Sequence, residues 1–365
     1  MGGAISLFLL EFKKMIRSKT FTYLLILTLI LVCALFARNS MQQHTIPSNK
    51  IHEFYELYSE VIEQNELNEA ALLEDDSNSS GRNYQGYHFP GIRLIRTLSY
   101  YIQAVDHLDY QESLLSENDI YSAAIEYLDY DGQLNVKHED LLNELVMNLE
   151  LNRLNLVKEL PNQSVQPALF TLSVTTLLSK YGLLIVLLFS IAYTVNKKKR
   201  NNGVSILSTL PISFRRLTTV QMLSFFSVGM MLVIVIWGIA IGLPFLFVTQ
   251  DTSSFSYPLL TPEHDFINIG SYLPFVAMFQ ITVIVFTSSL YTLTANITTK
   301  KAWALIISLF LSFILLMVYE YLPPLLPNQS FMATPHSYMY GSVILLVLSA
   351  IFIYFLTSDQ QRRDQ

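Results

Sequence analysis

The chain has little cysteine and little charge, and it lacks several common catalytic motifs. Its one cysteine, Cys33, cannot form an intramolecular disulfide. The 365 residues contain no nucleotide-binding loop of the form G-x-x-x-x-G-K-[ST], no zinc-binding H-E-x-x-H and no G-x-S-x-G nucleophile elbow. We therefore expect that the chain is not an enzyme and that it holds no catalytic residue, metal or cofactor of its own.

Long hydrophobic runs are what the sequence has in abundance. It is 52% hydrophobic and 14% charged, with a mean hydropathy of +0.38, which departs from soluble averages towards membrane proteins. Six uncharged runs each supply all or most of the roughly 20 apolar residues that a helix needs to cross hydrocarbon. The sequence predicts six transmembrane helices at about 20–38, 172–195, 218–247, 272–296, 302–321 and 339–357.

The basic residues predict the orientation of these helices. Fourteen of the 23 lysines and arginines lie before the first span, between spans two and three, between spans four and five, and after the sixth. The positive-inside rule then places both termini and the tail 358–365 in the cytoplasm, and an even number of spans agrees with this because it puts both termini on the same side. The lysine-rich inner loops fit a multi-pass protein of a bacterial plasma membrane.

The segment between spans one and two carries the opposite charge. Residues 39–170 contain 22 acidic and 7 basic side chains. Apolar residues recur at helical spacing in this segment, and we expect helices around Ile51–Ile62, Ile92–Glu112, Glu117–Asp129 and His138–Leu160, with a break at Asp75–Gly91. The predicted fold class is an all-α polytopic membrane protein: six transmembrane helices plus a mostly helical, acidic extracytoplasmic domain over 39–170.

This acidic domain offers several weak candidate sites. Its tyrosine-rich part, from Tyr100 to Tyr130, is either a ligand surface or aromatic packing in a small core, and packing is favoured. The acidic excess can bind cations or cationic peptides, or simply be a solvated surface. His52 and Glu56 lack a third metal ligand. Asp129–Gly132 resembles a calcium loop but lacks the carboxylates at its first and twelfth positions, so we reject an EF-hand.

Residues 1–19 form an amphipathic segment ahead of the first span. Its apolar residues would face lipid and its basic residues would meet headgroups on the inner leaflet. The apolar residues are Ile5, Phe8, Leu9, Phe12 and Ile16, and the basic ones are Lys13, Lys14 and Arg17.

A basic loop at 196–217 separates spans two and three, within the stretch "YTVNKKKRNNGVSILSTLPISFRRLTTVQ". Its cytoplasmic anchors are Lys197, Lys198, Lys199, Arg200, Arg215 and Arg216. Between them lies an apolar patch of two helical turns, which a proline ends: Gly203, Val204, Ile206, Leu207, Leu210, Pro211 and Ile212. Such a helix either docks in a groove on a cytoplasmic partner or lies on the anionic leaflet.

The motif "STLPIS" followed by "FRRLTTVQ" entering a long span resembles the coupling-helix region of the ATP-binding-cassette (ABC) transporter permeases of the type-two exporter family. The start, "ISLFLLEFKKMIRSKTFTYLLILTLIL", resembles that family's interfacial helix and first span. The chain departs from the family pattern with Lys197–Arg200 and Gln221, where members often carry a Glu and a Lys.

This resemblance implies a six-span permease subunit that contacts a cytoplasmic ABC ATPase through Gly203–Ile212 and pairs with a second permease subunit, the same or related. ATP and Mg would bind only to the ATPase. The expected function is export of amphipathic, peptide or lipid-like cargo across the lipid bilayer, with no role for nucleic acid. The alternative is a membrane-anchored sensor or assembly factor whose acidic outer domain binds a cationic ligand.

A few polar and small residues in the spans are further candidates for a translocation path or a subunit interface. Gly238 and Gly242 permit close helix approach, either between subunits or within one bundle. Gln280, Thr287 and Ser288 could line a polar path, although hydroxyls that bond back to their own helix are the simpler explanation. Glu320 ends the fifth span, where it is either functional or snorkels to the interface.

Overall fold

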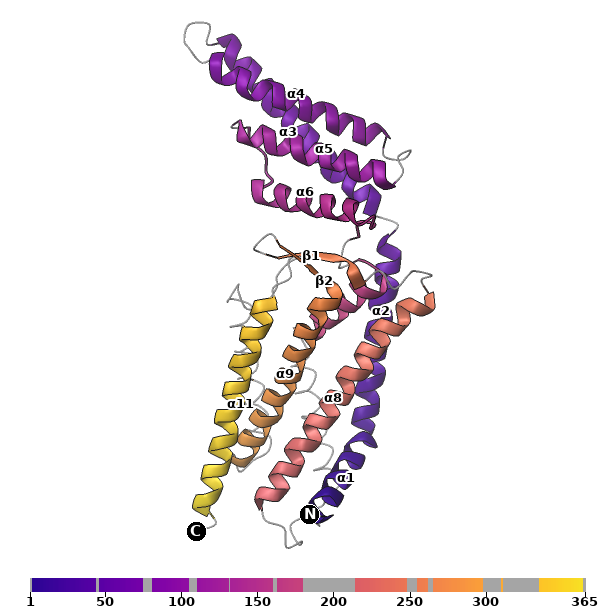
Figure 1. Ribbon diagram of the computed structural model, residues 1–365, viewed down its shortest axis with the longest axis vertical. Helices are drawn as coiled ribbons and strands as arrows, with labels where there is room; N and C mark the ends of the chain where they lie inside the picture. Colours follow the sequence, from indigo (N-terminus) through magenta and orange to yellow (C-terminus); the bar gives the residue numbers. More distant parts are fainter. Residues whose placement is uncertain are drawn as a thin grey trace. The chain divides into compact units, whose positions relative to one another are not determined.

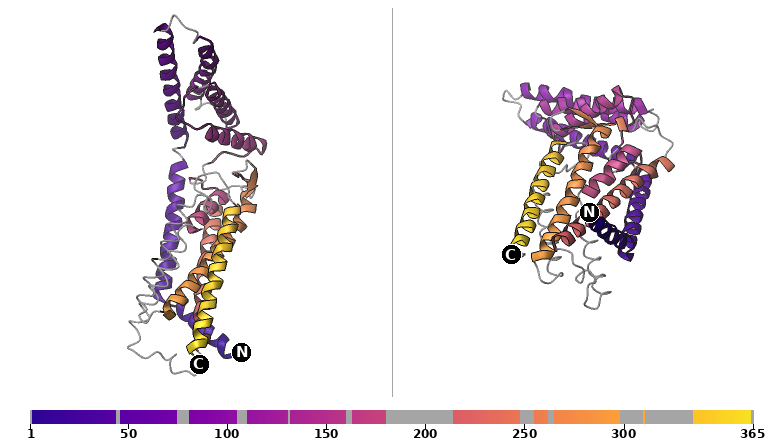
Figure 2. Two further views of the ribbon diagram at one scale, coloured as in Figure 1. Left: turned by 90° about the vertical axis from the view of Figure 1, so that its left-hand side faces the viewer. Right: turned by 60° about the horizontal axis from the view of Figure 1, so that its bottom comes forward.

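The computed structural model describes residues 2–43, 46–74, 81–104, 110–130, 132–159, 163–179, 214–247, 255–261, 265–297, 310 and 335–363. This part of the chain is mainly helical (Figures 1 and 2) and falls into two compact units. We call the first the span unit; it comprises residues 1–38, 165–256 and 268–365. The second, which we call the polar unit, comprises residues 39–164 and 257–267.

The span unit contains the apolar helices. They are α1 (Gly2–Ile16), α2 (Lys19–Gln43, whose last residues belong to the polar unit), a short helix Pro167–Ser179, α8 (Phe214–Phe247), α9 (Ile269–Ile297) and α11 (Pro335–Arg363). Among the described residues, four segments are long and apolar enough to cross a membrane: Lys19–Gln42, Thr218–Phe247, Ile269–Leu290 and Tyr338–Phe355. They coincide with four of the six expected spans.

The other two expected spans fall largely outside the described residues. Of 172–195, the structure describes only the part up to Ser179, and of 302–321 only Phe310. The count of six spans therefore stays a prediction.

A sharp corner joins α1 to α2. Ser18 caps the start of α2, because its Oγ accepts a hydrogen bond from the Phe21 amide at 3.2 Å. The same hydroxyl donates to the Met15 carbonyl at 2.6 Å and so also closes the end of α1. The start of α1 and the end of α11 lie at the same end of the span unit (Figure 1).

Helix α1 packs on the first half of α8. Met15 of α1 is buried with Phe225, Val228 and Leu232 of α8, and Phe21 of α2 completes this cluster. Phe12 and Ile16, both half-buried, pack against the same cluster, so they face α8 in part and not lipid alone, as had been expected. The physical reason is that α8 offers them a protein surface, whereas Ile5 and Leu9 remain exposed as expected.

The short helix Pro167–Ser179 packs against α2 and α8. Phe170 and Val174 are buried with Val32 of α2 and Ala240 of α8. Because Pro244 has no amide hydrogen, it cannot bond to the Ala240 carbonyl four residues earlier. The buried hydroxyl of Thr171 donates to that carbonyl instead, at 3.3 Å, as the apolar surroundings require.

Aromatic side chains join α9 to α11, which lie side by side (Figures 1 and 2). The Tyr338 ring of α11 is buried, with its centroid 5.8 Å from that of Tyr272 and 5.3 Å from that of Phe279, both in edge-on geometry. Such pairs add to the stabilisation from burial alone.

The polar unit is built from four helices and one small hairpin. These are α3 (Ile46–Glu74), α4 (Gly81–Ala104), α5 (Tyr110–Asp129), α6 (His138–Arg153), β1 (Pro258–Leu260) and β2 (Phe266–Asn268, whose last residue belongs to the span unit). Within the unit, α4 contacts α3 and α5, and α5 contacts α6 (Figure 1). The core includes Val61, Leu94, Leu98 and Ile120, each fully buried. The sequence did not predict the hairpin.

Two helix boundaries in this unit differ from expectation. Residues 81–91, expected as part of a break, are helical. Gly91 is buried, and because it has no side chain the backbone of α4 can approach Asn65 of α3 and Tyr127 of α5. This contact with the rest of the unit favours the longer α4. Helix α6 ends at Arg153 rather than near Leu160, because Asn155 takes a left-handed conformation (φ 53°) and the Leu156 amide bonds back to Leu151 at 2.9 Å.

Gly229 marks a close approach of α8 to α9, and its substitution is a direct test of their packing. A Cβ atom at this position would lie 2.7 Å from Cγ2 of Ile284, a β-branched side chain with little freedom to move. We expect Gly229→Ala to destabilise the span unit by about 1–3 kcal/mol. Gly238→Ala is the matched control, because a Cβ there meets no described atom within 4 Å. Reversible unfolding in mixed micelles measures both, and equal effects would contradict this packing.

Candidate functional site

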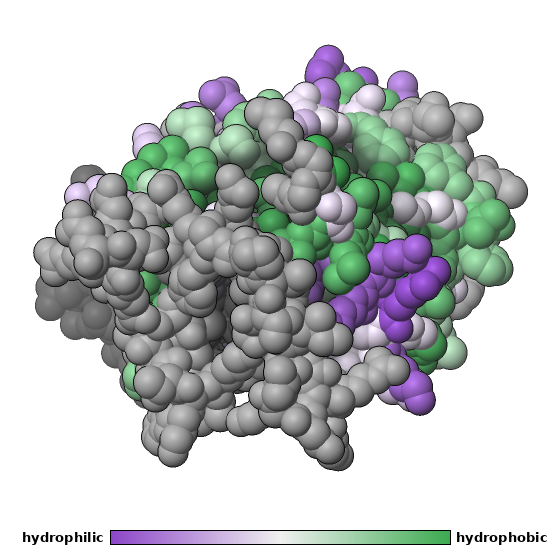
Figure 3. Space-filling view, turned by 90° about the horizontal axis from the view of Figure 1, so that it is seen from below, coloured by the Kyte–Doolittle hydropathy of each residue, from purple (hydrophilic) through white to green (hydrophobic). Residues whose placement is uncertain are grey.

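The predicted coupling stretch is not among the residues that the structure describes. Gly203–Ile212, the anchors Lys197–Arg200 and Glu320 all lie outside them. Arg215 and Arg216 fall in the first turn of α8. Of the predicted anchors on α1, Lys13, Lys14 and Arg17 are all exposed. Viewed from the end where α1 begins, hydrophilic surface lies directly beside hydrophobic surface (Figure 3).

Gly238 and Gly242 do not mark a close helix contact in the described part of the span unit. A Cβ atom built on either residue meets no described atom within 4 Å. Gly238 is exposed, and Gly242 is half-buried. Both alternatives, an interface with another subunit and packing within one bundle, remain predictions.

Gln280 is the centre of a polar cluster that joins three helices of the span unit. Its amide nitrogen donates to the Thr175 carbonyl at 2.8 Å and to the Ser179 hydroxyl at 3.1 Å. Its amide oxygen accepts a hydrogen bond from the Trp237 ring nitrogen at 2.8 Å. Gln280 is buried, and these bonds link α9 to α8 and to the helix Pro167–Ser179. The sequence singled out Gln280, and the structure places it in a joint between helices.

The hydroxyls of Thr287 and Ser288 bond within α9. Thr287 donates to the Val283 carbonyl at 2.9 Å, and Ser288 donates to the Ile284 carbonyl at 2.7 Å. Both side chains are buried. This is the arrangement in which helix hydroxyls satisfy themselves without a ligand.

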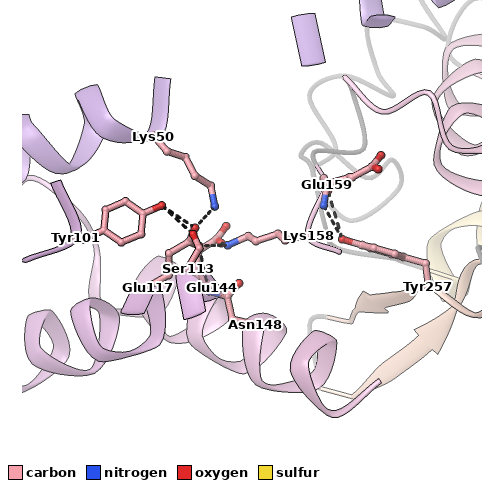
Figure 4. Close-up of polar contacts among 9 residues, drawn as sticks. All are labelled: Lys50, Tyr101, Ser113, Glu117, Glu144, Asn148, Lys158, Glu159 and Tyr257. Carbon is pink, nitrogen blue, oxygen red and sulfur yellow. Dashed lines mark hydrogen bonds and ion pairs between the residues drawn. The ribbon is translucent and has the colours of Figure 1, made fainter. Parts of the chain in front are cut away.

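The polar unit contains a buried charge cluster around Glu117 of α5, which the sequence analysis missed (Figure 4). One carboxylate oxygen accepts bonds from Lys50 of α3 at 2.5 Å and from the Tyr101 hydroxyl of α4 at 3.2 Å. The other faces Lys158 at 3.5 Å and the Asn148 amide of α6 at 3.4 Å. All four helices of the unit thus reach a single carboxylate, whose side chain is only 4% exposed.

Further groups surround the cluster. The Lys158 ammonium is 5% exposed and lies 2.6 Å from a Glu144 carboxylate oxygen. It also lies 5.5 Å from the centre of the Tyr121 ring, within the range of a cation–π interaction. The Ser113 hydroxyl is 3.4 Å from that of Tyr101. Lys50, whose side chain is 21% exposed, and the more buried Lys158 thus both pair with carboxylates of the cluster.

The electrostatics of the cluster follow from burial and from its two lysines. Burial alone would raise the pKa of Glu117, but Lys50 and Lys158 hold that pKa below its ordinary value. Burial, together with the repulsion from Lys158, lowers the pKa of Lys50. Burial raises the pKa of the Tyr101 and Tyr121 hydroxyls, and the nearby carboxylates raise it further. The cluster is thus most stable with Glu117 ionised and both tyrosines neutral.

The sequence carried one signal for this cluster. Leu114, Glu117, Tyr121 and Ala124 follow one another at spacings of three, four and three, which places the carboxylate on the core face of α5. An acidic residue in a buried helical stripe requires a partner. The lysines that supply it lie 67 and 41 positions away, so no local pattern identifies them.

The weaker candidates of the polar unit have ordinary structural roles. Tyr101, Tyr121 and Tyr127 are buried in the core, whereas Tyr100 and Tyr130 are exposed. The His52 and Glu56 side chains pair at 3.5 Å on an exposed face of α3. Among the described residues, no group of histidine, cysteine, aspartate and glutamate could hold a metal ion.

The four long apolar helices indicate a membrane protein. Comparison of the chain with protein-family models, curated proteins and solved structures finds no match. Any more specific function therefore rests on the residues of the chain itself.

Gln280→Leu tests whether the Gln280 cluster is a structural joint. The change removes three hydrogen bonds between helices and leaves the Trp237 N–H and the Thr175 carbonyl without this partner. We expect a loss of about 1–3 kcal/mol of stability. Thr287→Ala is the matched control, because its hydroxyl bonds only within α9 in the described contacts, and it should cost less than about 1 kcal/mol. Unfolding in micelles measures both variants, and a stable Gln280→Leu protein would contradict the joint.

Glu117→Gln tests the charge cluster. The amide keeps the shape of the carboxylate but leaves Lys50 and Lys158 without its charge, so we expect a loss of about 3–5 kcal/mol of stability in the polar unit. Glu56→Gln, at an exposed pair on α3, should change stability by less than about 1 kcal/mol. Thermal melting followed by circular dichroism, with hydrogen exchange to localise the change, separates the two.

The pH dependence provides the check on this experiment. Because the folded pKa of Glu117 is lowered, its contribution is complete above the unfolded value of about 4.3 and is lost as pH falls below it. Raised pKa values of Tyr101 and Tyr121 predict a second loss as pH rises above about 10. Glu117→Gln should weaken the acid transition and retain the alkaline one. An unchanged acid transition would contradict its assignment to Glu117.

Proposed function

We propose that the chain is the membrane-spanning permease subunit of an ABC transporter of the type-two exporter family. In this proposal it has six spans, the polar unit is extracytoplasmic, and both termini face the cytoplasm of a bacterial cell. A separate ATPase binds ATP and Mg, and a second permease subunit, the same or related, completes the transporter. The cargo is amphipathic, peptide or lipid-like.

The observation that carries the proposal is the packing of α1 on α8. Helix α8 begins at Phe214, immediately after the stretch "STLPIS" that resembles a coupling helix. Its first half buries Phe225 and Val228 against Met15 of α1. A push on the loop at 203–212 would therefore move α1 and α8 together, as an ATP-driven permease needs.

The surface of α1 supports a location at the membrane boundary. Ile5, Leu9 and Leu10 are 61%, 55% and 58% exposed, beside the exposed Lys13 and Lys14. Exposed apolar residues beside basic ones are typical of a helix that lies at an anionic membrane surface. This position would hold α1 next to the cytoplasmic partner.

Co-purification with an ATPase tests the proposal. The tagged full-length protein is isolated from its native membrane in mild detergent, and the associated subunits and ATPase activity are measured. We expect an ABC ATPase to accompany the parent protein and to be reduced at least about tenfold by Leu207→Asp or Leu210→Asp, because a charge on the apolar face opposes docking in an apolar groove.

Ser208→Asp is the matched control, since it adds the same charge at a polar position of the same stretch. It should retain the ATPase. Equal loss in all three variants would assign the effect to charge in the loop rather than to an apolar contact. Absence of any ATPase with the parent protein would overturn the permease proposal and favour the sensor or assembly factor.

A further inference from the structure

The hairpin between α8 and α9 belongs to the polar unit, although it lies in the chain between two spans. The chain passes between the two units four times: after Arg38, before Val165, after Ser256 and before Asn268. The last two crossings enclose the hairpin, whose turn closes through the Thr261 amide, 2.8 Å from the Asp265 carbonyl. The polar unit is thus attached to α8 and α9 as well as to α2 and the helix Pro167–Ser179.

Tyr257 fastens the hairpin to the segment that follows α6. Its hydroxyl accepts a hydrogen bond from the Glu159 amide at 3.3 Å and donates one to the Glu159 carbonyl at 3.4 Å (Figure 4). Tyr257 is 1% exposed, and Leu259 and Leu260 beside it are equally buried. Strand β1 also contacts α6. The hairpin is therefore packed into the polar unit.

The residue before Glu159 reaches in the other direction, into the charge cluster. The Lys158 ammonium contacts Glu144 at 2.6 Å and Glu117 at 3.5 Å. Two consecutive residues thus connect the core of the polar unit to the hairpin: the Lys158 side chain contacts the charge cluster, and the Glu159 backbone bonds to Tyr257. Figure 4 shows both sets of contacts on the two sides of this short segment.

The same segment also connects the two other points where the chain passes between the units, after Arg38 and before Val165. The Ser164 hydroxyl donates to the Glu159 carboxylate. The Ser164 carbonyl accepts a hydrogen bond from the buried Asn39 amide at 3.0 Å. Lys158, Glu159 and Ser164 therefore contact, respectively, the charge cluster, the hairpin and the point where α2 enters the polar unit.

We propose that Lys158 and Glu159 form a joint that makes the hairpin move with the helices of the polar unit. Through this joint, a change in the charge cluster is passed to the hairpin and along the chain to the start of α9, which directly follows β2. In the span unit, the residue that lies just ahead of the hairpin contacts the start of α9: a Cβ atom on Gly270 would lie 3.3 Å from the Phe255 carbonyl oxygen. Tyr257 is the positioning residue of the joint, and the inference is independent of the proposed transport activity.

Hydrogen exchange of the full-length protein in lipid nanodiscs tests the joint without any ATPase. Tyr257→Phe keeps the buried ring and removes both bonds to Glu159. We expect amide exchange to rise by about fivefold or more in 156–164 and in 258–268, and also in the first turn of α9. Tyr130→Phe, at an exposed tyrosine of the same unit, should change none of these segments.

Lys158→Met provides the second arm, because it keeps the aliphatic chain and removes the ammonium. It should raise exchange in the hairpin as well as in α5, and adding Tyr257→Phe should then have a smaller effect than in the parent, since coupled sites are not additive. If Lys158→Met leaves the hairpin unchanged, or if Tyr257→Phe acts only on 257–261, the joint does not exist. Neither result depends on whether an ATPase binds.

Discussion

The carboxylate of Glu117 is the constraint on which the arrangement of the polar unit depends. A buried charge is costly unless partners compensate it, and here the partners come from every helix of the unit. Apolar packing alone tolerates many arrangements of four short helices, whereas Lys50 and Lys158 can both reach this carboxylate in few of them. The cluster thereby fixes which helix faces meet, and it does so without a disulfide, since Cys33 is the only cysteine.

In the span unit, buried polar groups are satisfied by neutral partners instead of charged ones. Gln280 joins three helices through amide and indole hydrogen bonds, and Thr171 satisfies the Ala240 carbonyl that Pro244 leaves without an amide partner. Neutral partners suit a membrane interior because no net charge has to be desolvated. Gln280, which a sequence reader assigns to a polar path, therefore holds three described helices together.

The parts of the fold that could be predicted are those with a local pattern. The uncharged runs predicted the four described spans, and the helical spacing of apolar residues predicted α3, α5 and most of α6. The hairpin was not predictable, because two strands of three residues are too short to show alternation. The lysine partners of Glu117 and the close approach at Gly229 depend on which helices pack together, although these helices lie far apart in the sequence. No local pattern in a single sequence shows which helices will pack together. The coupling stretch 203–212, on which the permease proposal partly rests, stays a prediction from the sequence.

Helix α8 is the element on which these features converge. Its start follows the basic loop, and its first half packs on α1. In its second half, Trp237 bonds to Gln280, and the Ala240 carbonyl accepts a hydrogen bond from Thr171. Further along the chain follows the hairpin, which Tyr257 fastens to the polar unit. A displacement of α8 along its length would therefore strain its contacts to α1, to Gln280 and to Thr171 at once. Within the described part of the span unit, α8 thus links the packing of α1 to the hydrogen bonds of α9 and of the helix Pro167–Ser179.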